Sequence, residues 1–234
     1  MTSIDTIINR QLLKWELQHR QADEKKTDRP KPSPIVTISR ETGSRGSYFG
    51  SRLAMKLGYQ RLHREIIDSI CESSGYRKRI IESLDDRFRG SLSMLVESFF
   101  TGQVVDHSDY HRHLYKIVLS LSHLGGVVLM GRGGNFILGP NRGFHIRFIC
   151  DKEKRIENLM KFKELSQEEA LKEIEISDTK RSEFARKLFH CDINLPHHYD
   201  LVLNSTSIDV EELVDTAVTA IRGKMNKLLY SNNE

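Results

Sequence analysis

The chain has 234 residues, enough for a compact domain with a substantial buried core. Hydrophobic residues make up 38% and charged residues 29%, an ordinary composition for a soluble globular protein. The net charge of +4 favours anionic ligands, but it is too mild and too scattered to indicate nucleic-acid binding.

No segment reads as a membrane or export signal. The longest apolar runs, 125–130 and 144–150, are too short to span a bilayer, and residues 1–10 lack a basic region followed by an apolar core. The three cysteines are odd in number and form no CxxC pair, which argues against a disulfide framework or a cysteine zinc site. We therefore expect a cytoplasmic protein without membrane contact.

The first element is an expected amphipathic helix over 4–26, because apolar residues recur there at helical spacing. Three prolines between 28 and 34 end it and make an extended linker. The segment 1–34 is thus expected to be an appendage to the main domain. Two interpretations stay open: the helix packs on the body of the protein, or it contacts a second copy or another protein.

After the linker, strands and helices alternate. Short strands are expected at 35–39, 59–62, 126–131, 144–150 and 199–204. Helices are expected at 47–57, 151–163, 166–177, 178–189 and 210–229. Residues 63–124 read as mostly helical, with breaks near Gly75, Gly90 and 101–108. Short apolar strands separated by helices indicate an α/β fold with a parallel sheet covered on both faces.

The loop after the first strand has the features of a phosphate site. Residues 40–50 read RETGSRGSYFG and lead directly into a helix. Ligands of parallel sheets bind beyond the carboxyl ends of the strands, where the start of a helix presents unpaired N–H groups. The expected phosphate contacts come from Gly43, Ser44, Arg45, Gly46 and Ser47.

This loop departs from the standard P-loop pattern GxxxxGK[ST]. When Gly46 is aligned with the second glycine, Glu41 stands at the first. Ser47 then takes the place of the lysine, and Tyr48 that of the Ser/Thr. Taken alone, the loop is equally compatible with a plain turn between a strand and a helix.

Together with stretches downstream, the loop resembles the cytidylate-kinase-like family of P-loop nucleoside-monophosphate kinases. VTISRETGSRGSYFGSRLA at 36–54 is similar to the family's ITISREYGSGGREIGKKLA, and LHREII at 62–67 to its YDREL. VVLMGRGGNFIL at 127–138 contains the family's GRG, and DTKR at 178–181 matches its D-x-x-R lid. The stretch 199–215 resembles the family's last strand and closing helix.

The resemblance implies a three-layer α/β P-loop kinase fold with a central parallel sheet, occupying 35–230. It implies a helical NMP-binding section in 63–124 and a helical lid in 163–195. Residues 1–34 precede this domain, and 231–234 form a tail. The implied reaction is transfer of the γ-phosphoryl group of ATP, with Mg²⁺, to CMP or a related small acceptor.

The resemblance also implies roles for arginines, which make bidentate contacts to phosphate. Arg64 and Arg132, just after predicted strand ends, are expected to hold the acceptor phosphate. Arg40 and Arg45 are expected to face the donor phosphates or the transferred group. The catalytic set is Arg45, Arg132 and Arg181.

In the lid, Arg181 and Arg186 are expected to close over the phosphates, with Asp178 orienting Arg181 or contacting the acceptor's base or sugar. Asn204 and Ser205 are expected near the donor base. The ordinary alternatives stay open. A helical arginine is often a solvated charge or an ion-pair partner, and Asp178 could cap a helix.

Three features of the sequence bear on catalysis, and the first two depart from the family pattern. Ser47 stands where the family has Arg, and His63 where it has Asp. Met130 stands where a Walker-type magnesium carboxylate would be, so the metal ligands stay unassigned. Two functions remain open: a nucleotide kinase, and a nucleotide-binding sensor with weak or no catalysis that uses its N-terminal helix to bind a partner.

The segment 106–113 is rich in groups that bind metals. His107 and His111 would share a face of a helix, a spacing that suits zinc, but no further ligand stands at a recognised offset. The alternative is the polar start of a helix.

Overall fold

The computed structural model describes residues 3–25, 33–100 and 109–230. The chain forms two compact units: unit 1 comprises 1–35 and 62–126, and unit 2 comprises 36–61 and 127–234. The predicted linker as far as residue 32, the predicted break at 101–108 and the tail 231–234 lie outside the described residues.

Unit 1 is helical and unit 2 is α/β. Unit 1 contains α1 (Ile4–Lys25), α3 (Arg64–Glu72), α4 (Ser74–Glu82), α5 (Asp86–Ser98) and α6 (Asp109–Leu124). Strand β2 (Gln60–Leu62) spans the boundary between the units. Unit 2 contains β1 (Val36–Arg40), α2 (Gly46–Leu57), β3 (Val127–Met130), α7 (Gly134–Leu138), β4 (Phe144–Ile149), α8 (Lys152–Lys163), α9 (Gln167–Phe189), the 3₁₀ turn η1 (Pro196–His198), β5 (Leu201–Asn204) and α10 (Val210–Tyr230).

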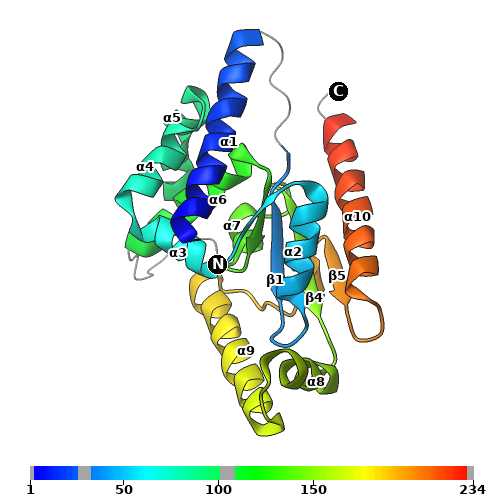
Figure 1. Ribbon diagram of the computed structural model, residues 1–234. Coiled ribbons are helices and arrows are strands. Elements are labelled where there is room, and N and C mark those ends of the chain that lie inside the picture. Colours follow the sequence, from blue (N-terminus) through cyan, green and yellow to red (C-terminus); the bar gives the residue numbers. More distant parts are fainter. Residues whose placement is uncertain (1–2, 26–32, 101–108, 231–234) are drawn as a thin grey trace. The chain divides into compact units, whose positions relative to one another are not determined.

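A five-stranded sheet with the order β2-β3-β1-β4-β5 organises unit 2 (Figure 1). Strand β1 is central and pairs in parallel with β3 and β4, and β4 pairs in parallel with β5. In this register Ile38 lies opposite both Met130 and Ile146. The carboxyl ends of these strands therefore share one edge, and the predicted α/β fold with a parallel sheet is confirmed.

Successive side chains of the strands point to opposite faces of the sheet, and helices cover both faces. One face packs under α2 and α10, which lie beside each other in Figure 1, and Phe49 of α2 stacks on Phe148 of β4 at 4.4 Å between ring centroids. On the opposite face α7 approaches closely at Gly134, where a Cβ atom would lie 2.6 Å from Leu129 and 3.1 Å from Thr37. Helices thus cover both faces of the sheet.

In unit 1 the N-terminal helix α1 packs against α3 and α4. Its buried side chains are Ile8, Leu12 and Trp15, which recur at helical spacing. The indole N–H of Trp15 donates to the carbonyl of Gly125 at 3.2 Å. A core stripe and a polar anchor therefore hold the helix within this unit.

The helix boundaries differ from the sequence-based prediction in two places. The helices predicted at 166–177 and 178–189 form the single helix α9, because no Gly or Pro interrupts this stretch. It starts with a capping box formed by Ser166 and Glu169. The break predicted near Gly90 is also wrong. Gly90 lies inside α5, and the chain turns earlier, where the Asp85 side chain caps the helix.

His145 makes the stability of the fold depend on pH. Its ring accepts the hydroxyl of Thr37 at Nδ1 and donates from Nε2 to the carbonyl of Gly139, each at 2.8 Å, so the neutral form fits both bonds. Burial lowers the pKa of His145, and the Gly139 bond offsets this in part. The unfolded chain therefore binds a proton first as the pH falls through about 6.5.

We expect the free energy of unfolding to fall as the pH drops below about 6.5. The measurement is urea unfolding at several pH values between 8 and 5, for the wild type and for His145→Gln. The variant loses the titrating ring, so its decline with pH should be shallower. Equal slopes would show that His145 is not the source.

Candidate functional site

The loop 41–45 joins β1 to α2 at the carboxyl edge of the sheet, and two glycines allow its path. Gly43 has φ +81°, and a Cβ atom there would lie 2.5 Å from the carbonyl oxygen of Arg155. A Cβ atom at Gly46 would lie 2.6 Å from the Cβ of Arg40. Both positions need glycine because the backbone passes so close to its neighbours.

The first four carbonyl groups of this loop accept hydrogen bonds from side chains, and the fifth, of Arg45, accepts the N–H of Phe49. The carbonyl oxygen of Glu41 accepts from Ser44 Oγ at 2.8 Å, and that of Thr42 accepts from Arg155 Nε at 2.7 Å. The carbonyl oxygen of Gly43 accepts from Asn158 Nδ2 at 2.9 Å, and that of Ser44 accepts from Ser205 Oγ at 3.0 Å. Fixing four successive carbonyls fixes the peptide planes between them. The loop is therefore shaped before any ligand arrives.

The N–H groups of the same loop are differently placed. Among the described residues, none accepts from the N–H of Gly43, Arg45 or Ser47. They lie at the start of α2, where the helix presents the positive end of its dipole. N–H groups without an acceptor, gathered in a loop at the start of a helix, form a binding site for anions such as phosphate.

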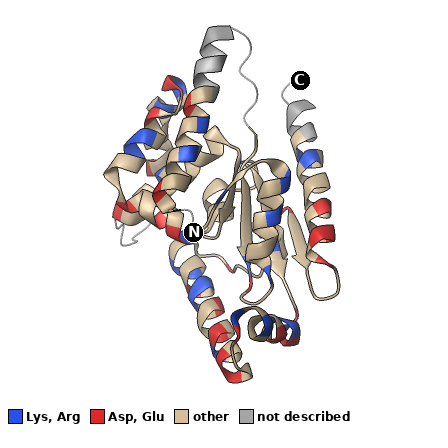
Figure 2. Cartoon of the chain, viewed as in Figure 1, with Lys and Arg blue, Asp and Glu red and all other residues tan. Residues whose placement is uncertain are grey.

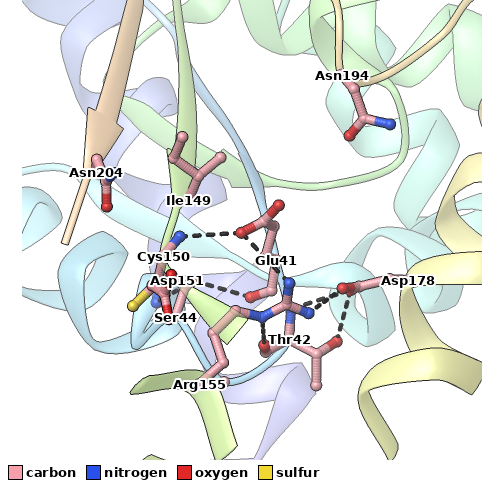
Figure 3. Close-up of polar contacts among 12 residues, drawn as sticks. Glu41, Thr42, Ser44, Ile149, Cys150, Asp151, Arg155, Asp178, Asn194 and Asn204 are labelled. Atoms are coloured by element: carbon pink, nitrogen blue, oxygen red, sulfur yellow. Dashed lines mark hydrogen bonds and ion pairs between the residues drawn. The ribbon is translucent and has the colours of Figure 1, made fainter. Parts of the chain in front are cut away.

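Arg155 of α8 is the centre of the polar network beside the loop (Figure 3). Its guanidinium lies 3.5 Å from the carboxylate of Glu41 and forms an ion pair with Asp178 of α9. Glu41 also accepts the N–H of Cys150 at 2.9 Å. Because Arg155 is buried, its positive charge needs these two carboxylates as compensating partners.

Asp178 and Arg181 attach α9 to the loop. One oxygen of Asp178 accepts the N–H of Thr42 at 3.0 Å and its hydroxyl at 2.9 Å. Arg181 donates to that same oxygen at 2.7 Å and to the Thr42 hydroxyl at 2.6 Å. Asp178 lies in the middle of α9, so the alternative that it caps a helix is wrong.

A third arginine lies under the site. Arg147 of β4 is buried; it donates to Ser39 Oγ at 2.8 Å and to Asn194 Oδ1 at 3.0 Å, and it lies 3.9 Å from Glu41. Burial lowers the pKa of Arg181, Asp178 raises it, and the charge of Arg147 lowers it. The arginine nevertheless stays charged at neutral pH. The cluster holds three arginines against two carboxylates, which favours an anion beside it.

Other residues predicted for the site lie around the same edge of unit 2. Arg40 ends β1, with its guanidinium close to Gly131. Arg132 follows β3 with φ 57°, and its guanidinium carbon is 5.4 Å from the ring centroid of Phe184. Ser205 holds the loop through its hydroxyl, as described above, and Asn204 is exposed at the end of β5.

The structure gives Arg64, Arg186, Ser47 and His63 the following surroundings. Arg64 belongs to unit 1, where it starts α3, has a 61% exposed side chain and lies 3.2 Å from Glu65. Arg186 is exposed in the last turn of α9. Ser47 is exposed at the start of α2, and His63 contacts Glu65 at 2.7 Å within unit 1.

Glu41, Arg147 and Arg155 are residues of the site that the sequence reasoning missed. Arg147 had a usable signal, because it interrupts the apolar run FHIRFI, and a buried arginine in a strand needs a partner. Glu41 and Arg155 gave no such signal. They stand 114 positions apart and meet only through the fold.

The carboxylates of the site do not fit direct ligation of a magnesium ion. Met130, where a magnesium carboxylate would stand in a Walker-type site, is buried, and a Cβ atom at Gly50 would lie 2.6 Å from its sulfur. The carboxylates of Glu41 and Asp178 face arginines. In the described parts of the chain no three His, Cys, Asp or Glu side chains gather as for a metal, and His107 lies outside those parts.

Lys and Arg alternate with Asp and Glu over the described surface (Figure 2). On α9 the acidic residues gather in the first half and the basic ones in the second. This arrangement suits the helix dipole and leaves the basic half to supply Arg181. In the part of the chain that the structure describes, no helix has the length and apolar character needed to cross a membrane.

A family model matches most of the chain. Residues 35–207 match the model of the family described as "Cytidylate kinase-like family". A curated relative, the Uronate isomerase of Corynebacterium glutamicum, is 37% identical over 94 residues, which are 40% of this chain and 18% of that protein. The chain thus spans less than a fifth of the length of that relative.

Solved structures share the fold at low sequence identity. The crystal structure of an uncharacterized protein from Eubacterium ventriosum has a TM-score of 0.64 at 17% identity, covering 82% of this chain and 99% of that one. A gluconokinase from Sinorhizobium meliloti has a TM-score of 0.43 at 14% identity, covering 88% and 100%. The first supports the fold alone, and the second is too distant to support an inference.

Asp178 should hold the loop to α9 through its charge. In Asp178→Asn the carboxylate that faces Arg155 and Arg181 becomes neutral, and we expect the free energy of unfolding to drop by about 1–3 kcal/mol. Hydrogen exchange at the amide of Thr42 should also become faster. Urea unfolding and amide exchange with mass spectrometry measure these effects.

Glu183→Gln is the matched control, because Glu183 is an exposed acid of the same helix with only a 3.9 Å pair to Lys187. We expect it to change neither quantity measurably. If both variants behave alike, Asp178 is no more than a surface charge.

Proposed function

The chain belongs to the cytidylate kinase-like family, and from this membership and the loop geometry we propose that it transfers the γ-phosphoryl group of ATP to a nucleoside monophosphate such as CMP. The family model covers the part of the chain that contains the whole site of unit 2. We propose the identities of both the phosphate donor and the acceptor.

One observation carries the proposal: surrounding side chains hold the carbonyls of the loop, while the N–H groups of Gly43, Arg45 and Ser47 have no acceptor among the described residues. Phosphoryl transfer needs positioning and charge neutralisation more than covalent chemistry. A rigid set of N–H donors at a helix start supplies both without reorganising during the reaction. We therefore place the donor phosphates in this loop.

The transfer would proceed by direct displacement. An oxygen of the acceptor phosphate attacks the γ-phosphorus, the bond from that phosphorus to the β-phosphate oxygen breaks, and ADP leaves with its electron pair. The acceptor oxygen is already anionic, so no side chain has to remove a proton. The chain's task is to bring two anions together, and Arg40, Arg132 and Arg181 offset their repulsion.

Arg181 is well supported for this task by its contacts. It reaches the loop through Thr42 and is oriented by Asp178. Arg132 stands between two glycines after β3, and its ring contact with Phe184 of α9 gives its guanidinium a defined direction. We propose Arg132 for the acceptor phosphate and Arg181 for the transferred group. We further propose roles at the donor base for Asn204 and Ser205, and at the phosphates for Arg186.

Magnesium enters the proposal only as the usual companion of ATP. When bound it would neutralise charge on the phosphates. The nucleotide and water would supply its ligands, because the carboxylates of the site face arginines.

A second candidate function has its own support. A nucleotide-binding sensor would need the loop but not efficient transfer, and Ser47 lacks the cation that a P-loop lysine supplies. Leu13 and Leu17 are 55% and 49% exposed on one side of α1. We propose this surface for a second copy or a protein partner in that case.

The decisive measurement is ADP release with magnesium-ATP across a panel of nucleoside monophosphates, together with ATP titration by calorimetry. We expect ATP binding and turnover with at least one acceptor, CMP first. ATP binding without turnover on any acceptor would favour the sensor. Absence of ATP binding would remove both functions.

Arg132→Ala should raise KM for the acceptor by about ten- to a hundred-fold, the loss expected for a charge-assisted contact. The midpoint of thermal unfolding should barely move. Arg142→Ala is the control, because Arg142 is exposed in the loop before β4, at the opposite end of that strand. A large drop in thermal stability with unchanged KM would make Arg132 a structural residue.

A further inference from the structure

We infer that Arg45 supplies the phosphate cation that this loop otherwise lacks, and that Tyr48 and Phe162 are the residues that position it. The inference rests on the proposed function, because it assigns the cation of the same loop. Arg45 lies inside the loop, between Ser44 and the first residue of α2.

The two aromatic rings hold the guanidinium from different elements. The guanidinium carbon of Arg45 lies 4.8 Å from the ring centroid of Tyr48 on α2 and 5.0 Å from that of Phe162 on α8. Both distances are within the range of a cation–π contact. The ring of Tyr48 is itself fixed, because its hydroxyl donates to Glu211 at 2.9 Å.

These rings are unusually exposed for their size. Tyr48 is 43% exposed and Phe162 56%, so burial in a core does not explain their places. Phe162 also has the ammonium of Lys161 5.4 Å from its ring centroid. Two open rings that converge on one guanidinium at the loop indicate a positioning role.

The charge of Arg45 is available to a ligand. Among the described residues no carboxylate forms an ion pair with it, whereas Arg147, Arg155 and Arg181 each lie within 4.0 Å of a carboxylate. A ring face orients a guanidinium without neutralising it. The positive charge therefore stays at the loop, beside the unclaimed N–H groups.

The backbone conformation of Arg45 also supports a functional role. Its φ of 63° is in the left-handed region, which favours glycine, and an arginine there costs stability. Backbone strain of this kind persists at functional sites when something else maintains it. The chain keeps a strained arginine where a glycine would fit better.

The position of this cation differs from that of a standard P-loop. Aligning Gly46 with the second glycine of GxxxxGK[ST] places Ser47 at the lysine, so the cation of this loop, Arg45, stands two residues nearer to β1. The neighbouring Tyr48 offers Arg45 a ring face and no negative charge.

The test compares Arg45→Gly with the wild type by calorimetry with ATP and by thermal unfolding. We expect Kd for ATP to rise by about ten- to a hundred-fold, as for a lost charge-assisted bond, while the melting temperature rises. The salt dependence of Kd should become shallower, since one ionic contact is gone. A stable protein with unchanged Kd and salt dependence would overturn the inference.

The positioning role is tested by Phe162→Leu, which keeps the apolar bulk but removes the ring. We expect Kd for ATP to rise about two- to five-fold. Lys154→Ala removes an exposed cation of the same helix, paired with Glu157, and should leave Kd unchanged. If Phe162→Leu matches this control, the ring does not position Arg45.

The double variant Arg45→Gly with Ser47→Arg places the cation at the position of the P-loop lysine. We expect it to recover ATP affinity to within about three-fold of the wild type. A double variant as weak as Arg45→Gly would contradict the assignment of Arg45 as the phosphate cation of the loop. A wild type that does not bind ATP would contradict the proposed function instead, so the two failures are distinguishable.

Discussion

The ion pairs of Arg155 are the constraint on which the site depends. A buried guanidinium needs compensating carboxylates, and Arg155 meets Glu41 from the loop and Asp178 from α9. Its Nε also fixes the carbonyl of Thr42. One side chain of α8 thus joins three separate pieces of unit 2. If either carboxylate moved away, the charge of Arg155 would stay buried with too little compensation. We therefore expect α8, α9 and the loop to move together.

This constraint explains why the loop has the shape of an anion-binding site. A short loop could satisfy its own carbonyls with its own N–H groups, as a turn does. Here Arg155, Asn158 and Ser205 take those carbonyls. The N–H groups of Gly43, Arg45 and Ser47 consequently have no acceptor among the described residues. The loop is ordered when the protein folds, so the binding of a phosphate does not have to supply the free energy of ordering it.

Local patterns predicted the parts of the fold that depend on local rules. The apolar runs predicted the strands, and the glycines of the loop marked a turn that Gly43 and Gly46 do require. The order of the short motifs indicated the family. The predicted break inside α9 had no helix breaker to cause it, and the structure shows a continuous helix. The Glu41–Arg155–Asp178 network could not be predicted from the sequence, because a periodic pattern does not show which distant charged residues come into contact.

The charge balance of unit 2 links the network to the ligand. Around the loop, Arg147, Arg155 and Arg181 outnumber the two carboxylates that face them. Burial lowers the pKa of Arg181, and the charges of Arg147 and Arg155 lower it further. Such mutual repulsion among the arginines is relieved when an anion binds beside them. A bound phosphate would therefore tighten α9 on the loop. Closure of this helix and recognition of phosphate would then be one electrostatic event, since Arg181 takes part in both.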